Sequence, residues 1–125
     1  MAKKILIVDD EGIIRDAVKI SLESDEFMFY EAADGVEALN IAKEIKPDLV
    51  VLDVMMPGMV GYRVCKDLKS DPDTKGVLVV FLTARGGAEV ESTVKRSGGD
   101  ELIVKPFEPK ELREKVMEML EVKSP

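Results

Sequence analysis

Short apolar runs alternate along the chain with longer segments that have a helical hydrophobic period. The apolar runs cover residues 4–8, 27–31, 49–52, 77–82 and 102–104. Apolar residues recur every three or four positions over residues 13–22, 36–45, 60–68, 88–97 and 109–120. The runs predict buried strands, and the periodic segments predict amphipathic helices. Their alternation predicts an α/β fold in which helices cover both faces of a parallel sheet.

The predicted helix at 88–97 is anchored more weakly than the others. Val90 and Val94 are its only sizeable apolar residues, and Gly98 and Gly99 follow it as a C-terminal cap would. Because so few side chains can hold it on the sheet, we expect this helix to be the loosest element. Elements that move come from the least stable parts of a fold, so this helix is also a candidate for movement.

Residues that can handle a phosphoryl group follow four of the five predicted strands. Asp9 and Asp10 follow the first run, Asp53 the third, Thr83 the fourth and Lys105 the fifth. In open parallel sheets the functional site lies outside the carboxyl ends of the strands. We therefore expect these side chains to converge at one edge of the sheet.

Each of these residues also has a purely structural explanation. A polar residue just beyond a buried strand usually marks the point where the chain returns to water. Four ordinary exits would rarely assemble this set, and the remaining run leaves the sheet through Ala32 and Ala33. The joint pattern therefore favours a functional site.

The chemistry of this set suits phosphoryl transfer. Three carboxylates brought together repel one another unless a cation lies among them, and Mg²⁺, or Mn²⁺ in its place, prefers oxygen ligands. Phosphoryl transfer needs a nucleophile in line and positive charge on the transferred group. Asp53 can be the nucleophile, Lys105 can supply the charge, and Thr83 can donate a hydrogen bond.

The composition narrows the classes of function. At 125 residues we expect one domain. The longest apolar runs have about six residues, far fewer than the roughly twenty of a membrane helix, and no signal-peptide core follows Lys3 and Lys4. We therefore expect no membrane insertion and a cytoplasmic location. The net charge of −7 disfavours direct nucleic-acid binding.

Two residue counts exclude further classes. The chain has no histidine, so it cannot use a Ser-His-Asp triad, an imidazole metal ligand or a phosphohistidine of its own. Its single cysteine, Cys65, cannot form an internal disulfide. We expect Cys65 to be a packing residue on a helix.

Four motifs together resemble the signature of response-regulator receiver domains. They are IVDDE at 7–11, LDVMMPG at 52–58, LTA at 82–84 and VKPF at 104–107. The resemblance covers about residues 2–122, so we expect residues 1–125 to form a single receiver domain of the stand-alone, CheY-like kind. It implies a doubly wound, flavodoxin-like (βα)₅ fold with a five-stranded parallel sheet of order 2-1-3-4-5.

The resemblance also assigns roles to the residues at the strand ends. It implies that a sensor histidine kinase or a phosphotransfer protein phosphorylates Asp53 with the help of Mg²⁺. Asp10, Asp53 and the backbone carbonyl of Met55 would bind the ion directly, and Asp9 would act through water. Lys105 would pair with the phosphoryl group or, before phosphorylation, with Asp53. The X-Pro bond after Lys105 would be cis.

The family's switching mechanism implies a partner surface. Thr83 would move toward phosphorylated Asp53, and segments 88–97, 102–104 and 109–120 would rearrange to bind a downstream effector. The residues that we expect on this partner surface are Arg85, Val90, Leu102 and Phe107. We expect a monomer or a weak phosphorylation-dependent dimer. It would catalyse only its own phosphotransfer and dephosphorylation.

Four positions depart from the family pattern or vary within it. Leu102 stands where the family usually has an aromatic ring that turns inward on activation, so partner recognition would rest on other groups. Val60 replaces an Asp that commonly caps the third helix, a cap typically worth about 1 kcal/mol. Met55 and Arg85 occupy two variable positions that tune the lifetime of the phosphoryl group.

Three other functions remain open on the sequence. A phosphatase of the haloacid-dehalogenase type would have a second Asp two residues after its nucleophile on the first strand, whereas this chain has Asp9 and Glu11. A flavodoxin-like carrier would bind the FMN phosphate through N–H groups and hydroxyls, and Asp9 and Asp10 would repel that anion. A pseudo-receiver would only hold partners together.

Overall fold

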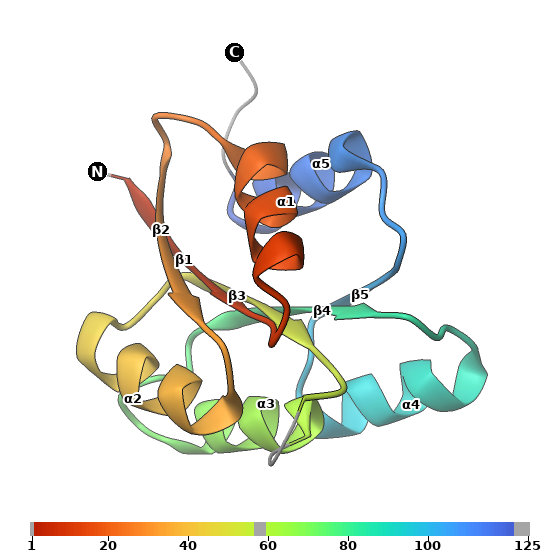
Figure 1. The fold of residues 1–125 in the computed structure, drawn as a ribbon. Helices are drawn as coiled ribbons and strands as arrows, with labels where there is room; N and C mark the ends of the chain where they lie inside the picture. Colours follow the sequence, from red (N-terminus) through yellow and green to blue (C-terminus); the bar gives the residue numbers. More distant parts are fainter. Residues whose placement is uncertain (1, 57–59, 122–125) are drawn as a thin grey trace.

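Strands and helices alternate throughout residues 2–56 and 60–121, the part of the chain that the computed structural model describes (Figure 1). The strands are β1 (Lys3–Val8), β2 (Phe27–Ala32), β3 (Leu49–Asp53), β4 (Leu78–Thr83) and β5 (Glu101–Val104). The helices are α1 (Gly12–Leu22), α2 (Gly35–Ile45), α3 (Gly61–Ser70), α4 (Ala88–Ser97) and α5 (Pro109–Met119). The predicted alternation is confirmed.

The strands form one parallel sheet in the order β2-β1-β3-β4-β5. From β1 the chain therefore moves first to one side of the sheet, to β2, and then to the other side, to β3. In open α/β sheets such a reversal places a crevice outside the carboxyl ends of the strands. The expected doubly wound fold and its strand order are confirmed, and the reversal lies between β1 and β3.

Helices cover both faces of the sheet. Successive side chains of a strand point to opposite faces. On β1, Leu6 and Val8 pack in the cluster that includes α2, α3 and α4, whereas Ile5 and Ile7 pack with α1 and α5. Figure 1 shows the same division, with α1 and α5 above the sheet and the other helices below it. A strand buried on both faces is apolar at every position, which explains the continuous apolar runs.

Several element boundaries differ by one or two residues from the prediction. Helix α3 begins at Gly61, because Val60 is its N-cap residue, with an extended backbone and no capping side chain. Strands β2 and β4 extend to Ala32 and Thr83, because these residues pair in register with the last residues of β1 and β5. Hydrophobicity does not report backbone pairing, so these ends were not predictable from the apolar runs.

Helix α4 buries only Val94 and Ser97, whereas every other helix buries at least three residues. This agrees with the weak anchoring expected from its sequence. The mobility of α4 stays a prediction.

Cys65 is fully buried on α3, as expected of a packing residue. Among the described residues, no helix is both long and apolar enough to cross a membrane. Pro57 and Gly58, the end of the second motif, lie outside the described residues.

Candidate functional site

The candidate site lies where four neighbouring strands end. Asp53 and Thr83 are the last residues of β3 and β4, and Asp9 and Lys105 directly follow β1 and β5. Asp10 is the next residue on the loop after β1. Because β1, β3, β4 and β5 are parallel neighbours, these ends share one edge of the sheet. The structure thus brings the predicted residues together, and their roles stay predictions.

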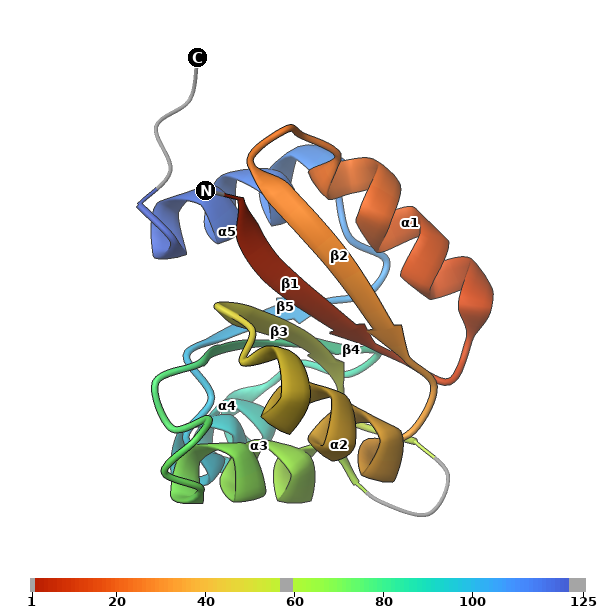
Figure 2. The same cartoon turned by 90° about the vertical axis from the view of Figure 1, so that its left-hand side faces the viewer.

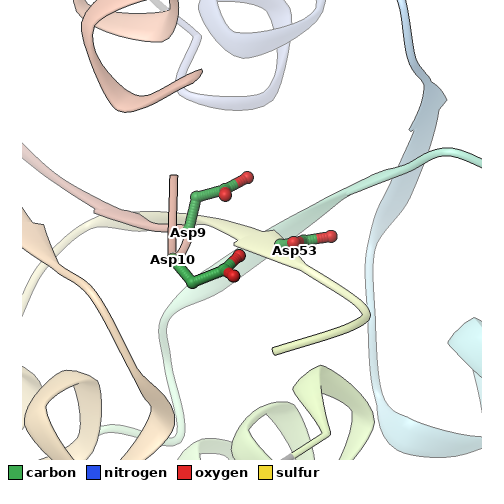
Figure 3. Close-up of side chains that lie close together, drawn as sticks. All are labelled: Asp9, Asp10 and Asp53. Atoms are coloured by element: carbon green, nitrogen blue, oxygen red, sulfur yellow. The ribbon is translucent and has the colours of Figure 1, made fainter. Parts of the chain in front are cut away.

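Three carboxylates face one another at this edge. Figure 3 shows Asp9 and Asp10 on the loop after β1 and Asp53 at the end of β3. One oxygen from each carboxylate lies within 4.8 Å of the others. Asp9 and Asp53 are only 2% and 7% exposed, whereas Asp10 is exposed. This set fits a hard divalent cation such as Mg²⁺ or Mn²⁺, which would relieve the mutual repulsion.

Lys105 lies between the two buried carboxylates. Its Nζ is 3.1 Å from Asp9 Oδ2 and 3.6 Å from Asp53 Oδ1. The resemblance implied pairing with Asp53, and the structure adds a closer contact with Asp9. Burial alone would lower the pKa of Lys105, but the hydrogen bond with Asp9 and the charges of Asp9 and Asp53 outweigh it and raise the pKa. Lys105 therefore stays cationic at neutral pH.

The environment of Asp53 disfavours its charged form. Burial, followed by the charge of Asp9, raises the pKa of Asp53 above its usual value. Lys105 and the N–H of Met55, which donates to Asp53 Oδ1 at 3.4 Å, oppose this shift only in part. A cation among the carboxylates would favour the charged form, which is the form that can act as a nucleophile.

Thr83 links the ends of β4 and β5. Its side chain is buried, and its Oγ1 accepts a hydrogen bond from the N–H of Arg85 at 3.2 Å. Its carbonyl accepts from the N–H of Lys105 at 2.7 Å. Thr83 lines a cavity of about 460 Å³ that Asp53, Met55 and Lys105 also line. There is room beside Asp53 for a group that Thr83 and Lys105 could contact together.

The residues expected on the partner surface include side chains that pack on each face of the sheet. Arg85 and Val90 line the cavity beside Asp53, and Leu102 lines a separate cavity between α4 and β5. Val90 and Leu102 pack with the cluster on one face of the sheet, whereas Phe107 packs with the cluster on the other. The four residues therefore lie around the edge of the sheet, and their role in partner binding stays a prediction.

The structure adds residues that the sequence reasoning missed. Arg15 on α1 donates from Nη1 to the carbonyl oxygen of Asp9 at 2.7 Å. Its Nε also donates to Glu31 on β2 at 3.0 Å, and Lys19 donates to the same carboxylate at 2.9 Å. The available signals were two cations four residues apart in a predicted helix and one carboxylate in an otherwise uncharged strand.

The peptide bond between Lys105 and Pro106 is cis, as the resemblance implied.

The sequence also has close relatives among known proteins. It matches the family described as the response regulator receiver domain over residues 5–117. It is 42% identical to the phosphate regulon transcriptional regulatory protein PhoB of Escherichia coli, over 100% of this chain and 55% of that protein. The chain spans about half the length of the curated relatives it matches.

Solved structures show the same fold. The chemotaxis protein CheY4 of Vibrio cholerae is 32% identical and superposes with a TM-score of 0.86, over 95% of this chain and 98% of that one. DrrB of Thermotoga maritima is 31% identical with a TM-score of 0.88, over 97% of this chain and 54% of that one. With this strand order and these motifs, the chain belongs to the family of response regulator receiver domains.

Proposed function

We propose that this domain accepts a phosphoryl group on Asp53 from a sensor histidine kinase or a phosphotransfer protein. The observation that carries the proposal is the position of the buried Asp53 carboxylate, which lies 3.6 Å from the Lys105 ammonium and within 4.8 Å of the Asp9 and Asp10 carboxylates. A nucleophile, a cation and an acidic metal site at one cavity are the components that phosphoryl transfer requires.

In the proposed reaction an oxygen of Asp53 attacks the phosphorus of a donor phosphohistidine. The P–N bond breaks, its electron pair stays on the imidazole, and the new P–O bond makes an acyl phosphate on Asp53. Lys105 balances charge on the phosphoryl oxygens, and the Thr83 hydroxyl donates a hydrogen bond to one of them. Hydrolysis of the acyl phosphate returns Asp53 and inorganic phosphate.

Mg²⁺ or Mn²⁺ would be held by Asp10, Asp53 and the backbone carbonyl of Met55, with Asp9 acting through water. When bound, the ion supplies positive charge that offsets the carboxylates and the phosphoryl oxygens. Asp53 and Met55 line one cavity together with Asp10, in agreement with this ligand set. Asp9 keeps Lys105 beside this cavity through their 3.1 Å contact.

Phosphorylation would shift the population of conformations at α4, β5 and α5 toward one that binds a downstream effector. PhoB is described as a transcriptional regulatory protein, and this chain matches 55% of it. We propose a protein partner for this domain and no direct contact with nucleic acid, in line with its net charge of −7. The cytoplasmic location, the stand-alone organisation and the monomer or weak dimer stay predictions.

The test is the mass of the intact protein after incubation with acetyl phosphate, with and without Mg²⁺. We expect a base-labile adduct of one phosphoryl group in the wild type with Mg²⁺, and none in Asp53→Asn. An adduct that Asp53→Asn retains would assign the phosphoryl group to another residue.

Beryllofluoride distinguishes a receiver that rejects acetyl phosphate from a pseudo-receiver. The receiver domain of DrrB has been solved in a BeF₃-activated form, and it superposes on this chain with a TM-score of 0.88. Mg²⁺-dependent binding of beryllofluoride would support the proposed acceptor site. If the wild type gives no adduct and binds no beryllofluoride, the proposal is wrong.

A further inference from the structure

A chain of polar contacts leads to the acidic site from β2, the strand that contributes no residue to it. Glu31 on β2 accepts from Arg15 Nε through Oε1 at 3.0 Å and from Lys19 Nζ through Oε2 at 2.9 Å. Arg15 then donates from Nη1 to the carbonyl oxygen of Asp9 at 2.7 Å. Both cations lie on α1, which runs beside β2 (Figure 2). We call Glu31, Arg15 and Lys19 the bracket.

The bracket holds a peptide whose orientation matters for the site. The Asp9 carbonyl belongs to the planar peptide unit that leads to Asp10, so fixing this oxygen fixes the direction in which the Asp10 backbone continues. At the other end of the residue, the N–H of Asp9 donates to the carbonyl of Ala32 at 3.2 Å. The two hydrogen bonds hold the backbone of Asp9 on both sides.

The arginine in the bracket is well suited to this task. Its guanidinium donates to two acceptors from nitrogens that are fixed in one plane, a rigid geometry that a lysine ammonium lacks. The Arg15 side chain is only 21% exposed, and its partner Glu31 is 35% exposed. The hydrogen bond from Lys19, and also that from Arg15, hold the pKa of Glu31 below its usual range. The carboxylate therefore stays charged and continues to hold the guanidinium.

We propose that Arg15 is a positioning residue for the divalent-cation site: held by Glu31, it orients the peptide between Asp9 and Asp10 and thereby places the Asp10 carboxylate for the ion. This inference rests on the proposed metal-dependent function. Charge alone would give Arg15 the opposite effect, because a guanidinium near three carboxylates opposes the binding of a cation. The direction in which Mg²⁺ affinity changes when Arg15 is removed therefore distinguishes an orienting role of Arg15 from a purely electrostatic one.

The test is the Kd of Mg²⁺ measured by titration calorimetry on the full chain. Loss of a group that orients a metal ligand typically weakens affinity by 10–100-fold, so we expect Arg15→Ala to raise the Kd by about tenfold. Arg15→Lys keeps the charge and a donating group but loses the planar fork, so we expect a smaller rise. The matched control is Arg113→Ala, which removes an arginine that donates to the carbonyl of Glu23 at 3.0 Å, and its Kd should equal that of the wild type.

A double-mutant cycle tests whether Glu31 on β2 affects the cation site through Arg15. If Glu31 acts through the guanidinium, Glu31→Gln should raise the Kd in the wild type and have no further effect in Arg15→Ala. Far-ultraviolet circular dichroism and thermal unfolding would establish that each variant is folded. Should Arg15→Ala fail to fold, Arg15→Lys and Glu31→Gln carry the same comparison.

Two outcomes would overturn the inference in different ways. If the wild type binds Mg²⁺ and Arg15→Ala binds it equally well or more tightly, Arg15 has no positioning role, and the proposed phosphoacceptor function is unaffected. If the wild type binds no Mg²⁺, the metal-dependent function itself is wrong, and the positioning role falls with it.

Discussion

Burial and the charge of Asp9 both act against the ionised form of Asp53. Both effects raise the pKa of Asp53 in the folded protein. A raised pKa means that the folded state binds the proton more tightly than the unfolded chain does. The ionised form of Asp53 therefore destabilises the folded state, and this loss grows as the pH rises through the two pKa values.

The stability of Asp53→Asn tests whether the ionised carboxylate destabilises the folded state. Without Mg²⁺, we expect the variant to unfold a few degrees above the wild type at neutral pH, because the amide carries no charge. The difference should shrink below about pH 4, where Asp53 is protonated in both states. Scanning calorimetry at a series of pH values measures both effects.

The exposed Asp25 offers the matched control, and Asp25→Asn should leave the unfolding temperature nearly unchanged. Added Mg²⁺ should stabilise the wild type more than Asp53→Asn, because in the proposed site the ion binds the folded state through Asp53. If Asp53→Asn is less stable than the wild type at neutral pH without Mg²⁺, the ionised Asp53 does not destabilise the folded state.

Among the elements, α3 begins directly against the end of β3. The N–H of Gly61 donates to the carbonyl of Val54 at 2.7 Å. A Cβ added to Gly61 would overlap the carbonyl oxygen of Asp53 and lie 3.0 Å from the Cα of Val54. These are backbone atoms, so a side chain here would displace either the helix or the end of the strand that carries Asp53.

We expect Gly61→Ala to lower the free energy of unfolding by about 3 kcal/mol, because overpacking against backbone leaves no side chain to move aside. Urea denaturation measures this loss. Gly76→Ala is the matched control, since a Cβ at Gly76 meets nothing within 4 Å and should change stability by less than about 1 kcal/mol. Equal effects of the two substitutions would show that the contact at Gly61 is unimportant.

For the whole molecule, Lys105 joins the acidic edge of the sheet to the region that is expected to switch. Its Nζ contacts Asp9 and Asp53, while its N–H donates to the carbonyl of Thr83 at 2.7 Å. The chain leaves Thr83 through an exposed loop into α4, the helix with the fewest buried residues. A change in the position of the Lys105 ammonium would therefore be transmitted to residues 83–105 through β4 and β5.

On binding beryllofluoride, we expect the wild type to change its amide exchange across residues 83–105. We expect Lys105→Ala to bind beryllofluoride but to lose this change. The reason is that the variant keeps the carboxylates while it removes the cation that couples them to β5. Hydrogen exchange followed by mass spectrometry measures the change. Lys110→Ala removes an exposed ammonium on α5 and should respond as the wild type does. An unaltered exchange response in Lys105→Ala would contradict the coupling.

Much of the fold was predictable because its physical causes are local. A strand covered by helices on both faces must be apolar along its whole length, so β1, β3 and β4 are visible as apolar runs. Once the strands are parallel, residues that follow them must meet at one edge. The convergence of Asp9, Asp53 and Lys105 follows from this order alone.

The contacts between distant segments were not predictable in the same way. Lys105 lies closer to Asp9 than to Asp53. Arg15 donates to the Asp9 carbonyl, and Glu31 on β2 accepts from the same Arg15 side chain. These distances depend on how far α1 and the loops lie from the sheet, and the hydrophobic pattern carries no information about that spacing.

The alternation of strands and helices, the parallel sheet and the residues at its acidic edge are already specified by the amino-acid sequence. The reason is that hydrophobic period and strand-end chemistry act over a few neighbouring residues. The folded structure is needed to see that Asp9 pairs most closely with Lys105, that a side chain at Gly61 would meet backbone, and that Glu31 on β2 holds Arg15. Those outcomes depend on packing distances between segments far apart in the chain, which exist only once the helices lie on the sheet.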